Sequence, residues 1–66
     1  MINIGEKLKE LRRAEGRTQA QTAELLKTSR VNYTRYETNA SRPDYEMLIA
    51  IADLYDMSVD ELFGRK

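Results

Sequence analysis

Two arginines lie near the middle of this 66-residue chain, in a segment that a helix would hold toward solvent. Ser29 is a residue type typical of helix N-caps, and Arg30, Val31 and Arg35 would then occupy the outward face of the helix that follows. A guanidinium group can donate two parallel hydrogen bonds to O6 and N7 of guanine, and a valine can pack on the methyl group of thymine. These residue types fit the reading of base edges in duplex DNA, although most arginines in proteins are solvated surface residues.

Two short helical patterns would position these side chains. Thr18 with Gln21 has the spacing of a capping box, which predicts a second helix that starts at Gln19. The side chains expected to face the interior from this helix and the next are Thr22, Ala23, Leu26, Tyr33 and Tyr36. Only a short run around Lys27 and Thr28 separates the two patterns, too short for an antiparallel pair, so the helices should cross at a steep angle.

A first helix is predicted over about residues 4 to 15, where apolar residues recur at helical spacing. Asn3 stands three residues before Glu6 in a cap-like pairing, and Gly16 ends the pattern. The polar face of this segment is dense in lysine and glutamate and indicates an ordinary solvated surface.

Two more helices are predicted after a loop at residues 38 to 43. Asp44 should cap the fourth helix, whose apolar stripe is expected to be the central element of the core: Met47, Leu48, Ile51, Leu54 and Tyr55. Ser58 and Glu61 form another capping box and open a short last helix that Gly64 ends. Tyr33, Tyr36 and Tyr55 are expected in the core with solvated hydroxyl groups, whereas Tyr45 can be exposed. Residues 1–66 therefore predict one all-α domain of five helices without a strand, linker or repeat.

The composition limits the chemistry that this domain can perform. Cysteine and histidine are both absent, which removes disulfides, Cys/His zinc sites, the commonest general base and the thiol nucleophile. The acidic residues between 53 and 61 do not have the spacing of an EF-hand loop. We therefore expect no enzymatic activity, no metal and no cofactor. No apolar run approaches the roughly 18 residues of a membrane span, and the first residues open no signal peptide, so a cytoplasmic protein is expected.

The charges are divided unevenly along the chain, although the formal net charge is zero. Residues 1–42 carry nine Lys or Arg against five Asp or Glu, whereas residues 43–66 carry two against six. Such a division suits a protein that presents one face to a polyanion.

The order and spacing of these segments resemble the Xre-type helix-turn-helix domain, similar to the Cro and repressor proteins of lambdoid phages. The resemblance is carried by LRRAEGRTQ (11–19), AELL (23–26), SRVNYTRYE (29–37), Pro43, MLIAIADLY (47–55) and SVDELF (58–63). Each segment alone is weak, but together they are specific and cover essentially the whole chain. The resemblance implies a compact five-helix, lambda-repressor-like fold in which the second and third helices form the helix-turn-helix.

The resemblance also implies roles for individual residues. The third helix would read bases through Arg30, Val31 and Arg35, and the residues placed near the DNA backbone are Gln19, Asn32, Thr34, Asn39 and Arg42. Gln19 would bond a phosphate and brace the reading helix, while Arg12 and Glu37 would form a partly buried structural ion pair. The chain departs from the family at Lys27, where glycine is common in a left-handed turn, and at three usually apolar positions: Arg17, Thr22 and Thr28.

The function that these observations favour is sequence-specific binding to double-stranded DNA by a transcriptional regulator, a repressor that acts as a homodimer on a palindromic operator. The expected dimer face is Leu54, Tyr55, Met57 and Phe63, which can also simply close a monomeric core. No small-molecule ligand is expected. The alternative is a protein–protein interaction module on the same scaffold, for example an antitoxin-like partner-binding protein. The two hypotheses differ in whether Arg30 and Arg35 share one exposed basic face.

Overall fold

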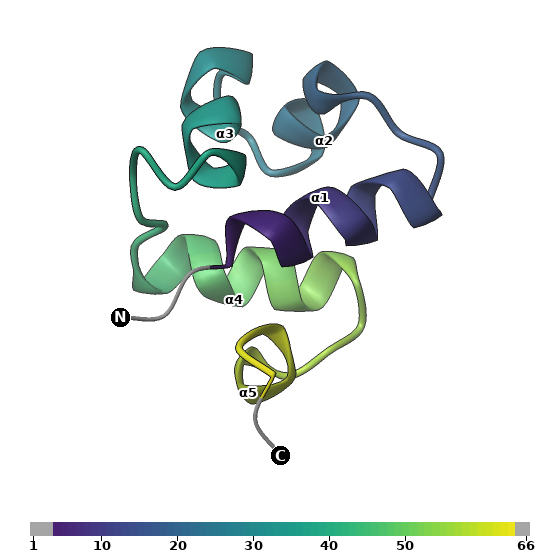
Figure 1. Ribbon diagram of the computed structural model, residues 1–66, viewed down its shortest axis with the longest axis vertical. Coiled ribbons are helices and arrows are strands. Elements are labelled where there is room, and N and C mark those ends of the chain that lie inside the picture. Colours follow the sequence, from purple (N-terminus) through teal and green to yellow (C-terminus); the bar gives the residue numbers. More distant parts are fainter. Residues whose placement is uncertain (1–3, 65–66) are drawn as a thin grey trace.

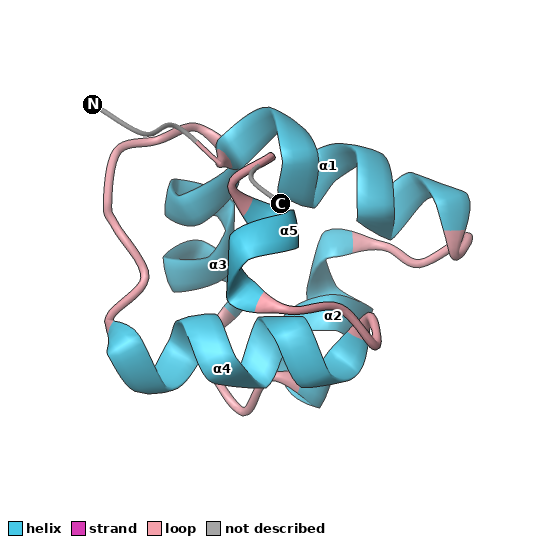
Figure 2. Cartoon of the chain, turned by 90° about the horizontal axis from the view of Figure 1, so that it is seen from below, coloured by secondary structure: helices cyan, strands magenta, loops and turns pink. Residues whose placement is uncertain are grey.

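The computed structural model describes residues 4–64, which form helices without any strand (Figure 1). In chain order they are α1 (Gly5–Ala14), α2 (Gln19–Leu25), α3 (Arg30–Glu37), α4 (Tyr45–Leu54) and α5 (Val59–Leu62). Seen from below, α1 and α4 lie on opposite sides of the molecule with α5 between them (Figure 2). Helices α2 and α3 lie together at the end of the molecule opposite α5 (Figure 1). The predicted all-α, five-helix architecture is confirmed.

Four of the five helices begin at the caps that the sequence predicts. The side chains of Thr18, Ser29, Asp44 and Ser58 each accept a hydrogen bond from the backbone N–H three residues later, at 2.8 to 3.1 Å. At Thr18 and Ser58 the reciprocal bond completes a capping box. Each such cap contributes about 1 kcal/mol of stability, so these helix starts are encoded locally.

The start of α1 differs from its prediction. Asn3 lies outside the described residues, and the N-cap position belongs to Ile4, whose side chain makes no cap bond. The backbone N–H of Gly5 donates instead to Oδ1 of Asn39, at 3.0 Å. A Cβ atom at Gly5 would lie 2.3 Å from the carbonyl oxygen of Glu37, so glycine is required for this close approach of α1 to the end of α3.

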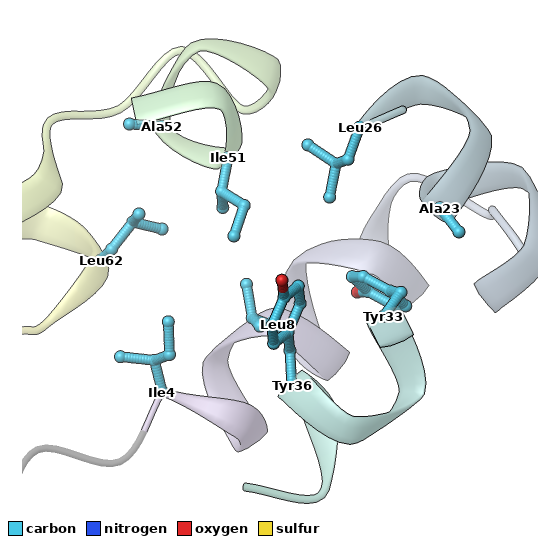
Figure 3. Packing of buried hydrophobic residues seen from close by; sticks show 9 residues of the cluster. All are labelled: Ile4, Leu8, Ala23, Leu26, Tyr33, Tyr36, Ile51, Ala52 and Leu62. Atoms are coloured by element: carbon cyan, nitrogen blue, oxygen red, sulfur yellow. The ribbon is translucent and has the colours of Figure 1, made fainter. Parts of the chain in front are cut away.

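All five helices contribute to the core (Figure 3). Its members are Ile4, Leu8, Ala23, Leu26, Tyr33, Tyr36, Ile51, Ala52 and Leu62. The rings of Tyr33 and Tyr36 meet edge to face, with centroids 6.4 Å apart. Of the expected stripe on α4 only Ile51 is fully buried and the others are half-buried, so α4 shares the core with its neighbours and is not its single centre. The hydroxyl groups of Tyr33 and Tyr55 are buried, so the prediction of solvated hydroxyls was wrong for these two residues.

The turn between α2 and α3 is left-handed, with a φ angle of +59° at Lys27. The N–H of Thr28 donates to the carbonyl of Ala23 at 2.9 Å, and that of Lys27 donates to Glu24 at 3.0 Å. This pair of bonds is a Schellman motif, which closes the end of α2. A lysine therefore stands where the backbone favours glycine.

Candidate nucleic-acid interface

Helix α3 has one buried side and one exposed side. Tyr33, Tyr36 and Glu37 face the interior, with exposed fractions of 0%, 7% and 3%. At about 100° per residue, Val31 lies almost opposite these three side chains. Val31 is 65% exposed, so this side of α3 faces away from the core.

Arg30 and Arg35 flank Val31 on this outward face, and both are exposed. The two arginines are about 140° apart around the helix axis, with Val31 and the half-buried Thr34 between them. Nε of Arg35 donates to Oγ of Ser41, in the loop after α3, at 3.0 Å. This bond orients the arginine side chain and does not use the two terminal nitrogens of the guanidinium. Ser41 was not predicted, because a contact six residues away in a loop leaves no periodic pattern.

Gln19, the first residue of α2, joins that helix to α3 by two hydrogen bonds. Its Nε2 donates to Oε1 of Glu37 at 3.1 Å, and its Oε1 accepts from Oγ1 of Thr34 at 3.0 Å. One of the two Nε2 hydrogens remains for a further acceptor. The side chain thus braces α3 and can still donate to a phosphate at the helix N-terminus.

The carboxylate of Glu37 ties three helices together. Nε of Arg12 on α1 donates to Oε2 at 2.6 Å and Nη2 donates to Oε1 at 3.3 Å, while Nη1 donates to the carbonyl of Arg17 at 2.9 Å. The side chains of Arg12 and Glu37 are 12% and 1% exposed. Burial opposes ionisation of Glu37, but the hydrogen bonds from Arg12 and Gln19 and the charge of Arg12 outweigh it and hold the pKa of this carboxyl below its usual value.

The remaining residues expected near the DNA backbone have unequal freedom to bind it. Arg42 is exposed in the loop before α4. Asn39 accepts the α1 N–H through Oδ1, which leaves its amide nitrogen to donate elsewhere. Asn32 donates both amide hydrogens inside the domain, to Oγ1 of Thr28 at 2.8 Å and to Oη of Tyr36 at 3.1 Å. In this arrangement Asn32 keeps only an acceptor, which cannot donate to a phosphate.

The four residues of the expected dimer face are all half-buried. They are therefore less accessible than the residues of an open binding surface. Leu54, Tyr55, Met57 and Phe63 all pack against the core. Among residues 4–64, the large apolar side chains that are exposed are Leu25, Val31, Tyr45 and Ile49. Tyr45 and Ile49 stand one turn apart on α4, so the largest apolar exposure on that helix lies away from the expected face.

Within the described residues, no helix has the length and apolar character needed to cross a bilayer. In the same part of the chain, no three acidic side chains gather as a metal ion would require.

A short turn that joins α2 to an outward, arginine-bearing α3 defines the class of helix-turn-helix domains that bind DNA. The profile of a family described as "Helix-turn-helix domain" matches residues 3–62. The chain belongs to the Xre-type helix-turn-helix family, whose members are DNA-binding proteins and not enzymes.

Two curated relatives and one solved structure illustrate the similarity. The cryptic phage CTXphi transcriptional repressor RstR of Vibrio cholerae is 41% identical over 64 residues, which are 97% of this chain and 57% of the relative. The HTH-type transcriptional regulator ImmR of Bacillus subtilis is 36% identical, covering 97% of this chain and 50% of the relative. A transcriptional regulator from Listeria innocua superposes with a TM-score of 0.88 at 33% identity, over 96% of this chain and 59% of the other. The chain spans about half the length of the curated relatives it matches.

Proposed function

We propose that this domain binds duplex DNA in a sequence-specific manner and represses transcription, with α3 lying in the major groove. The observation that carries the proposal is the outward face of α3, where Arg30 and Arg35 flank the exposed Val31. The opposite side of the same helix is fixed by Glu37 to both α1 and α2. A rigid helix with donors on its free face is suited to reading base edges.

Base recognition is assigned to Arg30, Val31 and Arg35, and positioning on the phosphates to Gln19, Asn39 and Arg42. The last three retain N–H groups that can donate to phosphate oxygens. The hydrogen atoms of Asn32 and Thr34 are used inside the domain, so these two residues support the interface by holding its helices.

We further propose that two copies bind a palindromic operator with half-sites about one helical turn apart. A single module of this size buries only about 600–1,000 Å² on DNA, which favours duplication for useful specificity. Leu54, Tyr55, Met57 and Phe63 remain the proposed contact between copies, since each is half-buried and keeps some apolar surface. RstR, the relative noted above, is itself described as a transcriptional repressor.

A protein-binding module on the same scaffold would not need a shared basic face. Because Arg30 and Arg35 do share one, the structure favours DNA as the partner.

The proposal is tested by fluorescence anisotropy of a labelled duplex over a series of salt concentrations. Binding through phosphates releases counterions, so the logarithm of the association constant should fall with that of salt, with a slope of about −0.9 per phosphate contacted. Arg42→Ala should make the slope shallower, while Glu46→Gln on the exposed acidic side of α4 serves as a control. Affinity that does not depend on salt would contradict the proposal.

A further inference from the structure

The two arginines on the outward face of α3 differ in how their side chains are held. The guanidinium of Arg35 donates through Nε to the hydroxyl oxygen of Ser41, at 3.0 Å. Among residues 4–64, no hydrogen bond or ion pair holds the side chain of Arg30. A long side chain that is already ordered loses less conformational freedom when it binds. The two arginines are therefore not equivalent as donors to DNA.

The hydroxyl of Ser41 has a fixed place because the loop after α3 folds back on the end of that helix. The backbone N–H groups of Ala40 and Ser41 both donate to the carbonyl oxygen of Arg35, at 2.9 and 3.2 Å. The same loop is tied to the start of α1, where the N–H of Gly5 donates to Oδ1 of Asn39 at 3.0 Å. The main chain and the side chain of Arg35 are thus bound to one short loop that is itself anchored to a second helix.

The bond to Ser41 also restricts how Arg35 can approach a base. A guanidinium is planar, so a bond at Nε fixes the plane in which the two terminal nitrogens donate. These nitrogens can donate two parallel bonds to O6 and N7 of guanine. An approach through Nε is blocked while Nε donates to Ser41, so Arg35 is held for an end-on approach.

We propose that Ser41 is a positioning residue for base recognition, which holds Arg35 for end-on reading of a guanine and makes that base more strictly selected than the base read by Arg30. The inference rests on the proposed function, because the base contact is part of that proposal. Ordering one long side chain before binding corresponds to about 2- to 10-fold in affinity. The hydroxyl hydrogen of Ser41 is not used in its bond to Arg35. If it served to bind a phosphate instead, Ser41 would strengthen binding to all sequences alike.

The first test needs no DNA and measures nitrogen-15 relaxation of the arginine Nε–H groups in the free protein. In the wild type the order parameter of Arg35 should exceed that of Arg30, which serves as the internal reference. Ser41→Ala should lower the Arg35 value to that of Arg30, whereas Ser41→Thr keeps a hydroxyl group and should preserve it. Equal order parameters for the two arginines in the wild type would overturn the inference.

The second test compares binding to a selected half-site duplex and to the same duplex changed at the base whose preference is lost in Arg35→Ala. Ser41→Ala should reduce the ratio of the two affinities by about 2- to 10-fold, and Ser41→Thr should restore it. The double variant Ser41→Ala/Arg35→Ala should bind like Arg35→Ala alone, because Ser41 acts through Arg35.

The outcomes separate this inference from the function on which it rests. Equal weakening of both duplexes by Ser41→Ala, or further weakening in the Arg35→Ala background, would show a phosphate contact and overturn the positioning role. An unchanged ratio in Ser41→Ala would also overturn it, while leaving Arg35 as a reading residue. A wild type that discriminates no base, or whose preference does not depend on Arg35, would refute the proposed function and the inference with it.

Discussion

Glu37 is the side chain through which the position of α3 is fixed. Arg12 on α1 and Gln19 on α2 both donate to its carboxylate, and all of these bonds lie on the side of α3 opposite Val31. The orientation of the exposed face of α3 is therefore set by hydrogen bonds on its buried side, made by groups that are not assigned to base recognition. The 25-residue separation of Arg12 and Glu37 gives no local pattern, so only resemblance to a family suggested their pairing.

Acid should loosen this junction. Because the folded-state pKa of Glu37 lies below its ordinary value of 4.5, its contribution is complete above that value and is lost as pH falls through the folded pKa. We expect the thermal midpoint of the wild type to fall as the pH is lowered below about 4.5. Glu37→Gln should be less stable at neutral pH, by on the order of 3 kcal/mol, and should show a smaller acid-induced fall.

The exposed Glu24 provides the matched control for this measurement, made by thermal denaturation monitored by circular dichroism. Glu24→Gln should keep both the neutral-pH midpoint and its acid dependence. Equal behaviour of Glu37→Gln and Glu24→Gln would show that the buried carboxylate is not the titrating group.

Asparagine is the residue type whose role the sequence predicts least well here. Asn39 caps the distant start of α1, and Asn32 bonds the turn before α3 and the ring hydroxyl of Tyr36. An amide can donate and accept at once, so its position in a DNA-binding motif does not distinguish an external contact from an internal one.

At the scale of elements, four successive helices end in the same way. Each is closed by the paired bonds of a Schellman motif, and the left-handed residues are Gly16, Lys27, Asn39 and Asp56. Glycine adopts this conformation without strain and asparagine tolerates it, whereas a lysine has no such adaptation. The resemblance predicted the left-handed turn at Lys27, but nothing in the pattern indicated Asp56.

Lys27→Gly should therefore raise the thermal midpoint. Relief of the left-handed strain, less the greater freedom of glycine in the unfolded chain, leaves a gain of about 1 kcal/mol, which corresponds to roughly 4–8 °C. Lys27→Ala keeps the Cβ atom and the strain, so it should leave the midpoint nearly unchanged. A lower midpoint for the glycine variant would mean that the lysine side chain itself stabilises the turn.

Helix starts were easier to predict than helix contacts. The caps at Thr18, Ser29, Asp44 and Ser58 act over three residues and are visible in the sequence. The start of α1 depends on a residue 34 positions away, and no local rule reaches that far. The apolar stripe of α4 likewise overstated the share of the core that this helix supplies, because the burial of each side chain depends on distant helices that pack against it.

At the scale of the whole molecule, the two ends differ in charge and in proposed role. Helices α2 and α3, from the basic part of the chain, lie at the end opposite α5, from the acidic part (Figure 1). DNA attracts the exposed arginines of α3 and repels the exposed acidic residues of α5. This separation leaves the α5 end free for a second copy, although its apolar residues are largely used in the core.

We expect the chain to be mainly monomeric alone and to pair when it binds an operator. Sedimentation velocity at micromolar concentration should give a monomer without DNA, and a complex of two chains per duplex with an operator. Met57→Glu should reduce the two-chain complex while leaving single-site binding intact, because Met57 lies on the proposed contact, in the turn between α4 and α5. Only one chain per palindromic duplex at saturation would contradict the paired arrangement.

The most direct test of the central claim is selection of bound sequences from a random pool of duplex DNA. The wild type should enrich sites with half-sites about one helical turn apart. Arg30→Ala should lose the preference at one base position in each half-site, worth about 1–3 kcal/mol, while Arg42→Ala should weaken binding to all sequences alike. Failure of the wild type to enrich any sequence, or an unchanged base preference in Arg30→Ala, would contradict the account of α3 as a reading helix.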